Sequence, residues 1–379
     1  MKNSLLKKIN LRTYMMIIAL VLIWGFFTML TQGMFLTPRN MSNLFRQSVF
    51  VSILAIGMAL VIILGEIDLS VGSVVGLTGG IIAILDVWNG MNPALSITIT
   101  LGAGLLIGLW QGFWVAYMKV PSFIVTLAGL LIFRGILVGI TKGTTIGPLS
   151  GVFKVIGKGY LDNTVGIIIG AVAVFFVVYI VFRSRKNKVK YKFDTGSLTV
   201  EILKLLIIIA LIAVFVWTMN SYRGVPVSLL FALIALVIFS YVSRNTVFGR
   251  SIYAIGGNKK AAALSGINIK KVMLNVYVLN GLMAALAGIL LTSRLNAASV
   301  QAGTTAELDA IGACVIGGAS LSGGIGTISG AVVGAIVMAS LDNGMSLMNM
   351  PMFWQSIIKG FVLLFAVWLD MATKNKNKA

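Results

Sequence analysis

The sequence predicts an all-α protein, a polytopic bundle of ten to twelve transmembrane helices, some of them broken or re-entrant. Composition is the first observation, because 58% of the 379 residues are hydrophobic and only 11% are charged. The second is that apolar runs of about the 20 residues needed to cross a hydrocarbon core recur along the whole chain. A helix is favoured because it satisfies its own backbone hydrogen bonds in lipid. We expect residues 1–379 to form one transmembrane domain.

The first apolar run, Tyr14–Leu30, follows a basic start and predicts a retained membrane span. A secretory signal peptide begins similarly, but no small-x-small cleavage site follows in Thr31–Leu36. Eleven further apolar segments are each expected to form a helix. In chain order they are Val49–Leu64, Val71–Leu85, Leu95–Tyr117, Ser122–Ile140, Val165–Phe182, Glu201–Thr218, Val227–Val242, Val272–Thr292, Leu308–Leu321, Ile325–Leu341 and Phe353–Leu369.

Two residue types that support much protein chemistry are almost missing. The chain has no histidine and a single cysteine, Cys314. This composition excludes disulfides within the chain, Cys/His metal sites and every catalytic triad that needs an imidazole. No catalytic residue and no metal ligand is therefore predicted.

The lysines and arginines predict the orientation. If every segment crosses, twenty of the 30 fall in loops on the side of the N-terminus and seven on the other side. The other three, Arg134, Lys204 and Lys359, lie within segments. Because basic loops stay in the cytoplasm, both termini are expected there, in a bacterial inner (plasma) membrane. The same spread accounts for the net charge of +20 without nucleic acid, and the run Arg183–Lys192 is expected to lie near anionic membrane lipid.

Two stretches are too short and too glycine-rich to form two full crossings each. Gly65–Ser70 leaves only a tight turn between its neighbours, and Leu308–Leu341 is interrupted by glycines at 317–326. The stretches also resemble each other, since an acidic pair separated by one residue occurs at 66–68 and again at 307–309. Interrupted segments in the two halves of a transporter indicate the substrate pathway. The alternative is a chance match of two acidic residues.

Polar residues within or beside the segments are candidates for this pathway. A charged group at a helix centre costs about 2.5–3.5 kcal/mol on insertion scales, so it lines a path or finds a partner. The candidates are Glu66, Asp68, Ser70, Arg134, Glu307, Asp309, Asp342 and Asn343. For the acidic residues and Asn343 the alternative is helix capping, and for Arg134 it is snorkelling to the membrane surface. Asn280 is expected to form interhelical hydrogen bonds.

The stretch Arg250–Val272 lies between two apolar runs, so it emerges from the membrane. Asn258 is a good helix N-cap and Gly266 a good helix end, which predicts a two-turn helix between them. Apolar residues would then project into water among lysines; they are Ile255, Leu264, Ile267 and Ile269. Such a surface is typical of a docking site for another protein. The alternative is a loop that folds onto its own spans.

Two long strings carry a resemblance to a known family. GEIDLSVGSVVGL at 65–77 and AIGGNKKAAALSGIN at 254–268 resemble the signature stretches of sugar ABC importer permeases of the ribose/galactose/xylose family. Further strings support it, among them KVPSFIVTLAG at 119–129 and AELDAIGACVIGGASL at 306–321. Within the family the resemblance favours the permeases that carry D-xylose. It implies a D-xylose or related monosaccharide substrate, a permease homodimer, a cytoplasmic ATPase subunit and an extracytoplasmic sugar-binding protein.

The resemblance also implies how the work is divided. In the family a short helix of the cytoplasmic loop, here 243–272, docks in a groove of the ATPase. The residues that carry over are Ala254, Gly256, Gly257, Asn258, Ala261, Ala262, Leu264, Ser265 and Gly266. The chain has no phosphate-binding G-x-x-x-x-G-K-[ST] loop. ATP is therefore expected on the partner, with no cofactor and no enzymatic activity in this chain.

Two further interpretations stay open at this stage. The loop Thr141–Asn163 is either a solvated connector or the surface that receives the binding protein. An ion-gradient-driven secondary transporter of a small polar solute is the alternative function. In that case Glu66, Asp68, Asp309 or Asp342 would carry the coupling ion.

Overall fold

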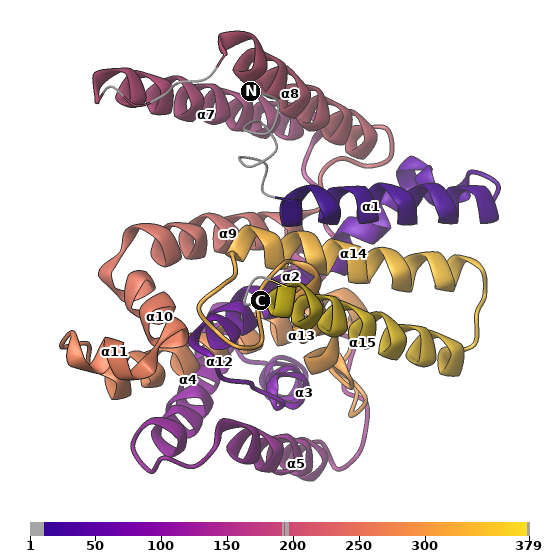
Figure 1. Ribbon diagram of the computed structural model, residues 1–379. Helices are drawn as coiled ribbons and strands as arrows, with labels where there is room; N and C mark the ends of the chain where they lie inside the picture. Colours follow the sequence, from indigo (N-terminus) through magenta and orange to yellow (C-terminus); the bar gives the residue numbers. More distant parts are fainter. Residues whose placement is uncertain (1–10, 192, 194–196, 377–379) are drawn as a thin grey trace.

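The computed structural model describes residues 11–191, 193 and 197–376. Within these residues the regular elements are helices, and β pairing is limited to two isolated bridges. In this described part of the chain ten helices are long and apolar enough to cross a membrane, which confirms the predicted fold class (Figure 1). Four lysines used to predict the orientation, Lys2, Lys7, Lys8 and Lys192, lie outside the described residues, as does Lys378.

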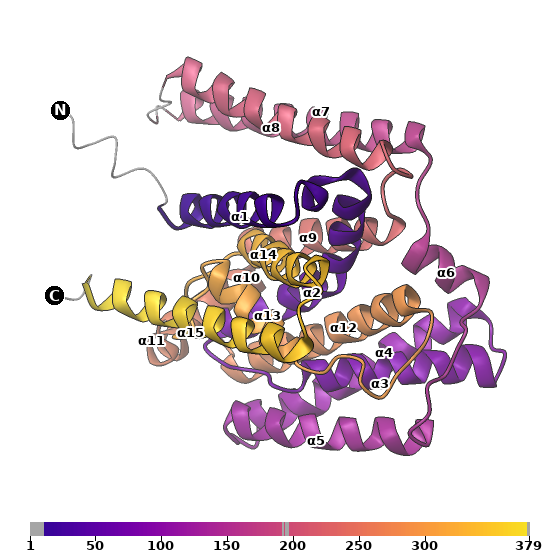
Figure 2. The same ribbon diagram turned by 90° about the vertical axis from the view of Figure 1, so that its right-hand side faces the viewer.

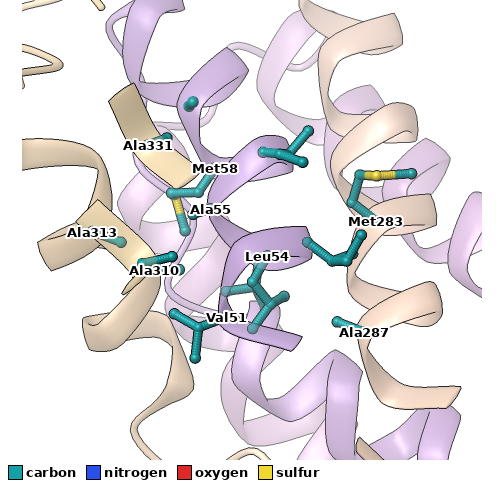
Figure 3. Close-up of a cluster of buried hydrophobic side chains, with 14 of the residues drawn as sticks. Val51, Leu54, Ala55, Met58, Met283, Ala287, Ala310, Ala313 and Ala331 are labelled. Carbon is teal, nitrogen blue, oxygen red and sulfur yellow. The ribbon is translucent and has the colours of Figure 1, made fainter. Parts of the chain in front are cut away.

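Helix α2 (Pro38–Leu64) forms the centre of the bundle. Its second half is buried on every side, with Ile53, Leu54 and Ile56 fully inaccessible. Figure 3 shows small and apolar side chains of α2 packed between α12 (Ile269–Leu295) on one side and α13 (Ala306–Ile316) and α14 (Ile328–Leu347) on the other. A helix that is apolar all round is buried in this way.

Helices α4 (Pro93–Ala116) and α12 pack with their backbones in direct contact. A Cβ atom on Gly108 would lie 2.3 Å from the carbonyl oxygen of Tyr277, and one on Gly281 would lie 2.3 Å from that of Gly104. Small residues permit this close approach between helices in lipid, where apolar side chains gain little by leaving the solvent.

Helix α3 (Val71–Ala83) continues as a π-helix, η3 (Ile84–Trp88), and contacts α5 (Ser122–Thr141). Helix α1 (Leu11–Leu30) leads through the short 3-10 helix η2 (Met34–Leu36) into α2 and contacts α14. Helix α9 (Val227–Asn245) lies beside α2. The predicted segments therefore correspond to helices. Helix α1 is not among the ten that are long and apolar enough to cross, since its described apolar stretch is Ile18–Leu30, and one further exception is described below.

Helices α7 (Asn163–Lys190) and α8 (Leu198–Asn220) form a hairpin at the edge of the bundle, visible at the top of Figures 1 and 2. Most of their side chains are exposed. An apolar cavity of about 490 Å³ separates the hairpin from α2, α9 and α14. The hairpin is thus attached loosely and presents its apolar surface to lipid.

The exception is α13, which has eleven residues and is about 16 Å long. It cannot span a hydrocarbon core of about 30 Å. The chain before it, 296–305, is not helical, and the chain after it is glycine-rich up to the start of α14. The predicted crossing at Leu308–Leu321 is therefore a half-helix, as the glycine pattern indicated.

The helices run between two sides of the molecule (Figure 2). One side, which we call the α11 side, contains α10 (Val247–Gly257) and α11 (Lys259–Leu264), which connect α9 to α12. The opposite side, here the α6 side, carries α6 (Gly151–Lys158) between α5 and α7. The N-terminal end of α1 and the C-terminal end of α15 (Met352–Lys376) both lie on the α11 side (Figure 2).

Candidate functional site

The turn Gly65–Ser70 is held by a buried network of polar side chains. Asp68 is 1% exposed, and its Oδ1 accepts hydrogen bonds from the backbone N–H of Ser70 at 2.8 Å and from the hydroxyl of Ser70 at 2.7 Å. Its Oδ2 accepts from the side-chain amide of Asn280 on α12 at 2.8 Å. The hydroxyl of Ser70 accepts from the amide of Gln111 on α4. These contacts join the start of α3 to α4 and α12.

This network lies well inside the molecule. Asn280 is eleven residues from the start of α12, or about 16 Å along its axis. Helix α3 therefore begins inside the bundle and not at its surface. In this conformation Asp68 and Ser70, two of the predicted pathway residues, connect helices and are closed to solvent. The expected interhelical role of Asn280 matches its contact with Asp68.

The irregular chain before α13 descends from the α6 side to the same level. Ala298 forms a β bridge with Ile146 near the α6 side. Further along, the carbonyl oxygens of Val300 and Ala302 accept hydrogen bonds from Arg134 on α5 at 2.6 and 3.0 Å. Arg134 thus neither snorkels to the surface nor relies on a carboxylate alone. It donates hydrogen bonds to backbone carbonyl groups that have no helical partner, because the segment that contains them is not helical.

The starts of α3 and α13 meet inside the molecule. A Cβ atom on Gly303 would lie 2.2 Å from the carbonyl oxygen of Gly72, and one on Gly72 would lie 2.1 Å from Oε2 of Glu307. The two helices begin side by side and extend to opposite sides of the membrane, α3 to the α6 side and α13 to the α11 side (Figure 2). Two interrupted elements that meet at mid-depth are the arrangement found at transporter substrate sites.

A second charged group joins α13, α14 and α15. Lys359 on α15 lies 2.9 and 3.1 Å from the two carboxylate oxygens of Asp309 and 3.0 Å from Oδ1 of Asp342. Asn343, next to Asp342, faces away and exchanges two hydrogen bonds with Asn40 on α2, at 2.8 and 3.1 Å. Asp309 and Asp342 therefore come together, whereas Asn343 belongs to a separate contact.

The predicted helix at Asn258–Gly266 is present as α11, of six residues. The side chain of Asn258 accepts from the N–H of Ala261 at 3.0 Å, and Gly266 ends the turn at a φ of +81°. Leu264 is 91% exposed, as expected of a docking residue. Ile255 is 3% exposed, so its predicted projection into water was wrong: it lies on α10 and packs into the core.

Four glycines hold this segment against the bundle, and we call them the glycine contact. They are Gly65, Gly256, Gly323 and Gly324. A Cβ atom on Gly256 would lie 1.8 Å from the carbonyl oxygen of Ile63 and 2.6 Å from the nitrogen of Gly324. The N–H of Gly324 donates to the same carbonyl oxygen at 2.8 Å. The end of α10 is thus in backbone contact with both the end of α2 and the α13–α14 connection.

Two side chains support the glycine contact. Tyr253 on α10 donates its hydroxyl to the carbonyl oxygen of Gly326 at 2.9 Å, and burial raises the pKa of this tyrosine. Lys259 at the start of α11 lies 3.5 Å from the carboxylate of Glu66. Glu66, a predicted pathway residue, therefore connects the turn Gly65–Ser70 to α11. A cavity of about 410 Å³ beside this ion pair is lined by Lys119 and Lys270 as well.

Several of these residues were not singled out by the sequence. Gln111 and Asn40 are polar residues in otherwise ordinary segments, and Lys359 was counted only as a lysine within a span. Charge in an apolar run was a usable signal for Lys359. Glycine spacing alone did not identify the glycine contact, because its members come from three distant parts of the chain.

Comparison with known proteins decides the family. A family model described as "Branched-chain amino acid transport system / permease component" matches residues 40–367. The chain belongs to this permease family. The permease is 51% identical over 372 residues to the xylose transport system permease protein of Escherichia coli (strain K12), covering 98% of this chain and 95% of the relative. It is 49% identical over 371 residues to the xylose transport system permease protein of Haemophilus influenzae, covering 98% of this chain and 99% of the relative.

A less similar relative is named for a different sugar, ribose. The ribose import permease protein of Bacillus subtilis (strain 168) is 35% identical to the permease over 341 residues, covering 89% of this chain and 86% of the relative. No solved structure matches the chain. The predicted family, sugar ABC importer permeases, and the predicted role as transmembrane permease subunit are confirmed. Membership of this family argues against the alternative of a secondary transporter driven by an ion gradient.

Proposed function

We propose that this permease carries D-xylose, or a closely related monosaccharide, into a bacterial cell at the expense of ATP hydrolysed by a partner. The choice of xylose as the substrate rests on the identity of 49% and 51% to two xylose permeases over 98% of the chain. Identity to the ribose permease is 35% over 89% of the chain. The permease itself binds no cofactor under this proposal.

The ATPase would dock on the α11 side. Leu264 is almost fully exposed there, and α11 stands between Lys259 and the lysines at 270 and 271. A push on α11 would be passed through the glycine contact to the end of α2 and to the α13–α14 connection. Because backbone touches backbone at these glycines, the push meets no flexible side chains. The half-helix α13 is the element that such a displacement would move.

The α6 side would receive an extracytoplasmic sugar-binding protein. Helix α6 buries Phe153 completely and exposes Val152 and Val155, so it presents an apolar stripe to a partner. The binding protein and a second copy of the permease would complete the importer. Both termini would then be cytoplasmic, since the first end of α1 and the last end of α15 share the α11 side.

The sugar path would run past the meeting point of α3 and α13. Arg134, Glu307 and Asp309 lie around this point, and Asp342 joins them through Lys359. Sugars are neutral but carry many hydroxyl groups, so a path lined by paired charges offers both donors and acceptors without a net attraction for ions.

Uptake measurements test the proposal. A strain lacking this gene, complemented with the wild-type permease, should take up radiolabelled xylose faster than ribose or galactose. Uptake should continue when ionophores collapse the proton and sodium gradients at constant ATP, and stop when ATP is depleted. Loss of uptake under ionophore at constant ATP would contradict the ATP-driven mechanism, and a preference for ribose or galactose would contradict the sugar.

A further inference from the structure

A small cavity lies between α13 and α15, beside the Lys359 ion pairs. Its volume is about 160 Å³. Its polar lining comes from Thr305 and Asp309 at the start of α13 and from Gln355, Ser356 and Lys359 on α15. The rest of the wall is Leu308, Met338, Met352, Gly360 and Leu363. The cavity therefore has charged, hydroxyl, amide and apolar groups within one small space.

The cavity lies at a depth where such groups are costly. Lys359 is seven residues from the start of α15, and Asp342 is five residues from the end of α14. At a rise of 1.5 Å per residue these positions are about 10 and 8 Å inside the helix ends. Charged side chains at such depth face a protein interior or a water-filled space, because a lipid tail cannot solvate them. Lipid is therefore a poor occupant for this cavity.

The donors and acceptors suit a ligand with several hydroxyl groups. The ammonium of Lys359 directs its protons at two carboxylates. Each carboxylate oxygen still has lone pairs that accept from a hydroxyl. With one cation and two anions, the group disfavours an anionic ligand. The methionine and leucine side chains across the cavity can cover the C–H face of a sugar ring.

The backbone at the cavity is strained. Thr305 has a φ of +63°, which a β-branched residue adopts rarely. Such strain costs about 1–3 kcal/mol and is retained where the surrounding structure requires it. Here it starts α13 at the cavity wall and places Thr305 in the lining.

We propose that this cavity is a binding subsite for the hydroxyl groups of the transported monosaccharide. This inference rests on the proposed function, since it takes the sugar to be the substrate. The carboxylate of Asp309, which lines the cavity, accepts hydroxyl hydrogen bonds while Lys359 pairs it with Asp342. Gln355 and Ser356 supply the specific contacts.

Gly360 offers a test that leaves the ion pairs intact. No atom lies within 4 Å of a Cβ atom built on Gly360, so a larger residue there meets open space, and both leucine and alanine favour the helix more than glycine does. Gly360→Leu should fill the cavity, and Gly360→Ala should fill little of it. Gly102→Leu on α4 is the matched control, because Gly102 has equally open surroundings and does not line the cavity.

The measurement is the initial rate of radiolabelled xylose uptake in cells, divided by the amount of permease in the membrane. Gly360→Leu should lower the rate about tenfold or more, whereas Gly360→Ala and Gly102→Leu stay within about twofold of wild type. Gln355→Ala should change the ratio of xylose to ribose uptake. If wild type takes up no xylose, the proposed function fails; if wild type does and Gly360→Leu equals it, the subsite is refuted.

Two other outcomes would also overturn the subsite. If Gly360→Leu loses uptake together with co-purification of a differently tagged second copy, the face is a contact surface and not a sugar site. If wild-type uptake depends on sodium at constant ATP and Gly360→Leu removes that dependence, the occupant is a cation. If Gly360→Leu loses uptake while the amount of permease in the membrane and the co-purification of the tagged second copy stay normal, the result supports the subsite.

Discussion

Replacing Gly256 by alanine should break the glycine contact. The added Cβ atom would lie 1.8 Å from the carbonyl oxygen of Ile63, whereas ordinary contact begins at 3.4 Å. The end of α10 would have to move about 1.6 Å away from α2, since backbone atoms at a packed contact cannot be compressed. No rotamer change relieves this clash, because the backbone fixes the position of the Cβ atom and the carbonyl oxygen is itself a backbone atom.

The expected cost follows from two contributions. Overpacking a tight contact costs about 1–3 kcal/mol. The hydrogen bond from Gly324 to Ile63 is drawn into the same displacement, and its loss adds about 0.5–1.5 kcal/mol. We therefore expect Gly256→Ala to destabilise the clamped arrangement by about 1.5–4.5 kcal/mol.

The neighbouring glycine is a matched control. A Cβ atom on Gly257 would have no atom within 4 Å, so Gly257→Ala should change stability by about 0.5 kcal/mol or less. The assays are thermal unfolding of the permease in detergent and xylose uptake normalised to membrane content. A complex reconstituted with its ATPase adds a third readout, the sugar carried per ATP hydrolysed.

Gly256→Ala should lower the unfolding temperature and the sugar carried per ATP, while Gly257→Ala matches wild type in all three assays. If the two variants are indistinguishable, α10 is not clamped as described. If Gly256→Ala lowers stability but leaves the coupling ratio unchanged, the glycine contact is structural and does not transmit the push.

Three further predictions concern single side chains. Asp68→Asn should keep most uptake, because its carbonyl oxygen still accepts the two hydrogen bonds from Ser70. Asn280 can also turn its amide so that its oxygen, which has no hydrogen-bond partner in the described structure, accepts the new N–H. Asp68→Ala should lose most uptake, and equal, complete loss in both variants would refute the hydrogen-bonding role. Asp309→Asn should likewise retain more uptake than Asp309→Ala in an assay normalised to the amount of permease in the membrane, although Asn also removes the charge that pairs with Lys359. Ala262→Arg should insert normally but lose co-purifying ATPase, since Ala262 is 4% exposed. At Gly266 the space is open but the φ is +81°, so both Ala and Val should strain the turn, and Val more than Ala because it is β-branched. If neither variant lowered co-purification of the ATPase, the left-handed turn would not be needed for docking.

The sequence was sufficient to predict the membrane spans, because hydropathy over about 20 residues reflects a strong and local physical constraint. Capping was equally local, and the helix ends at Asn258 and Gly266 are where side-chain and backbone preferences place them. The broken character of the segment at α13 also followed from glycines that interrupt an apolar run.

Contacts between distant segments could not be derived in this way. The partner of Asp309 is on α15 and that of Asp68 is on α12, and nothing in a single sequence indicates which helices touch. Periodicity likewise did not show that Ile255 faces the core, because α10 was read as part of an exposed loop. Pathway residues were therefore identified by type, while their grouping into separate networks required the fold.

The separation of Asp309 from its cation has a consequence for how the protein is made. Lys359 follows Asp309 by fifty positions in the chain, and α13 is too short to cross a bilayer alone. During synthesis, α13 therefore reaches the membrane with an unpaired carboxylate and too little apolar length to be released into lipid. Stable integration must wait until α14 and α15 have been synthesised and Lys359 arrives. The last three helices should enter the membrane as one unit, and a chain truncated before α15 should leave α13 accessible to the aqueous phase.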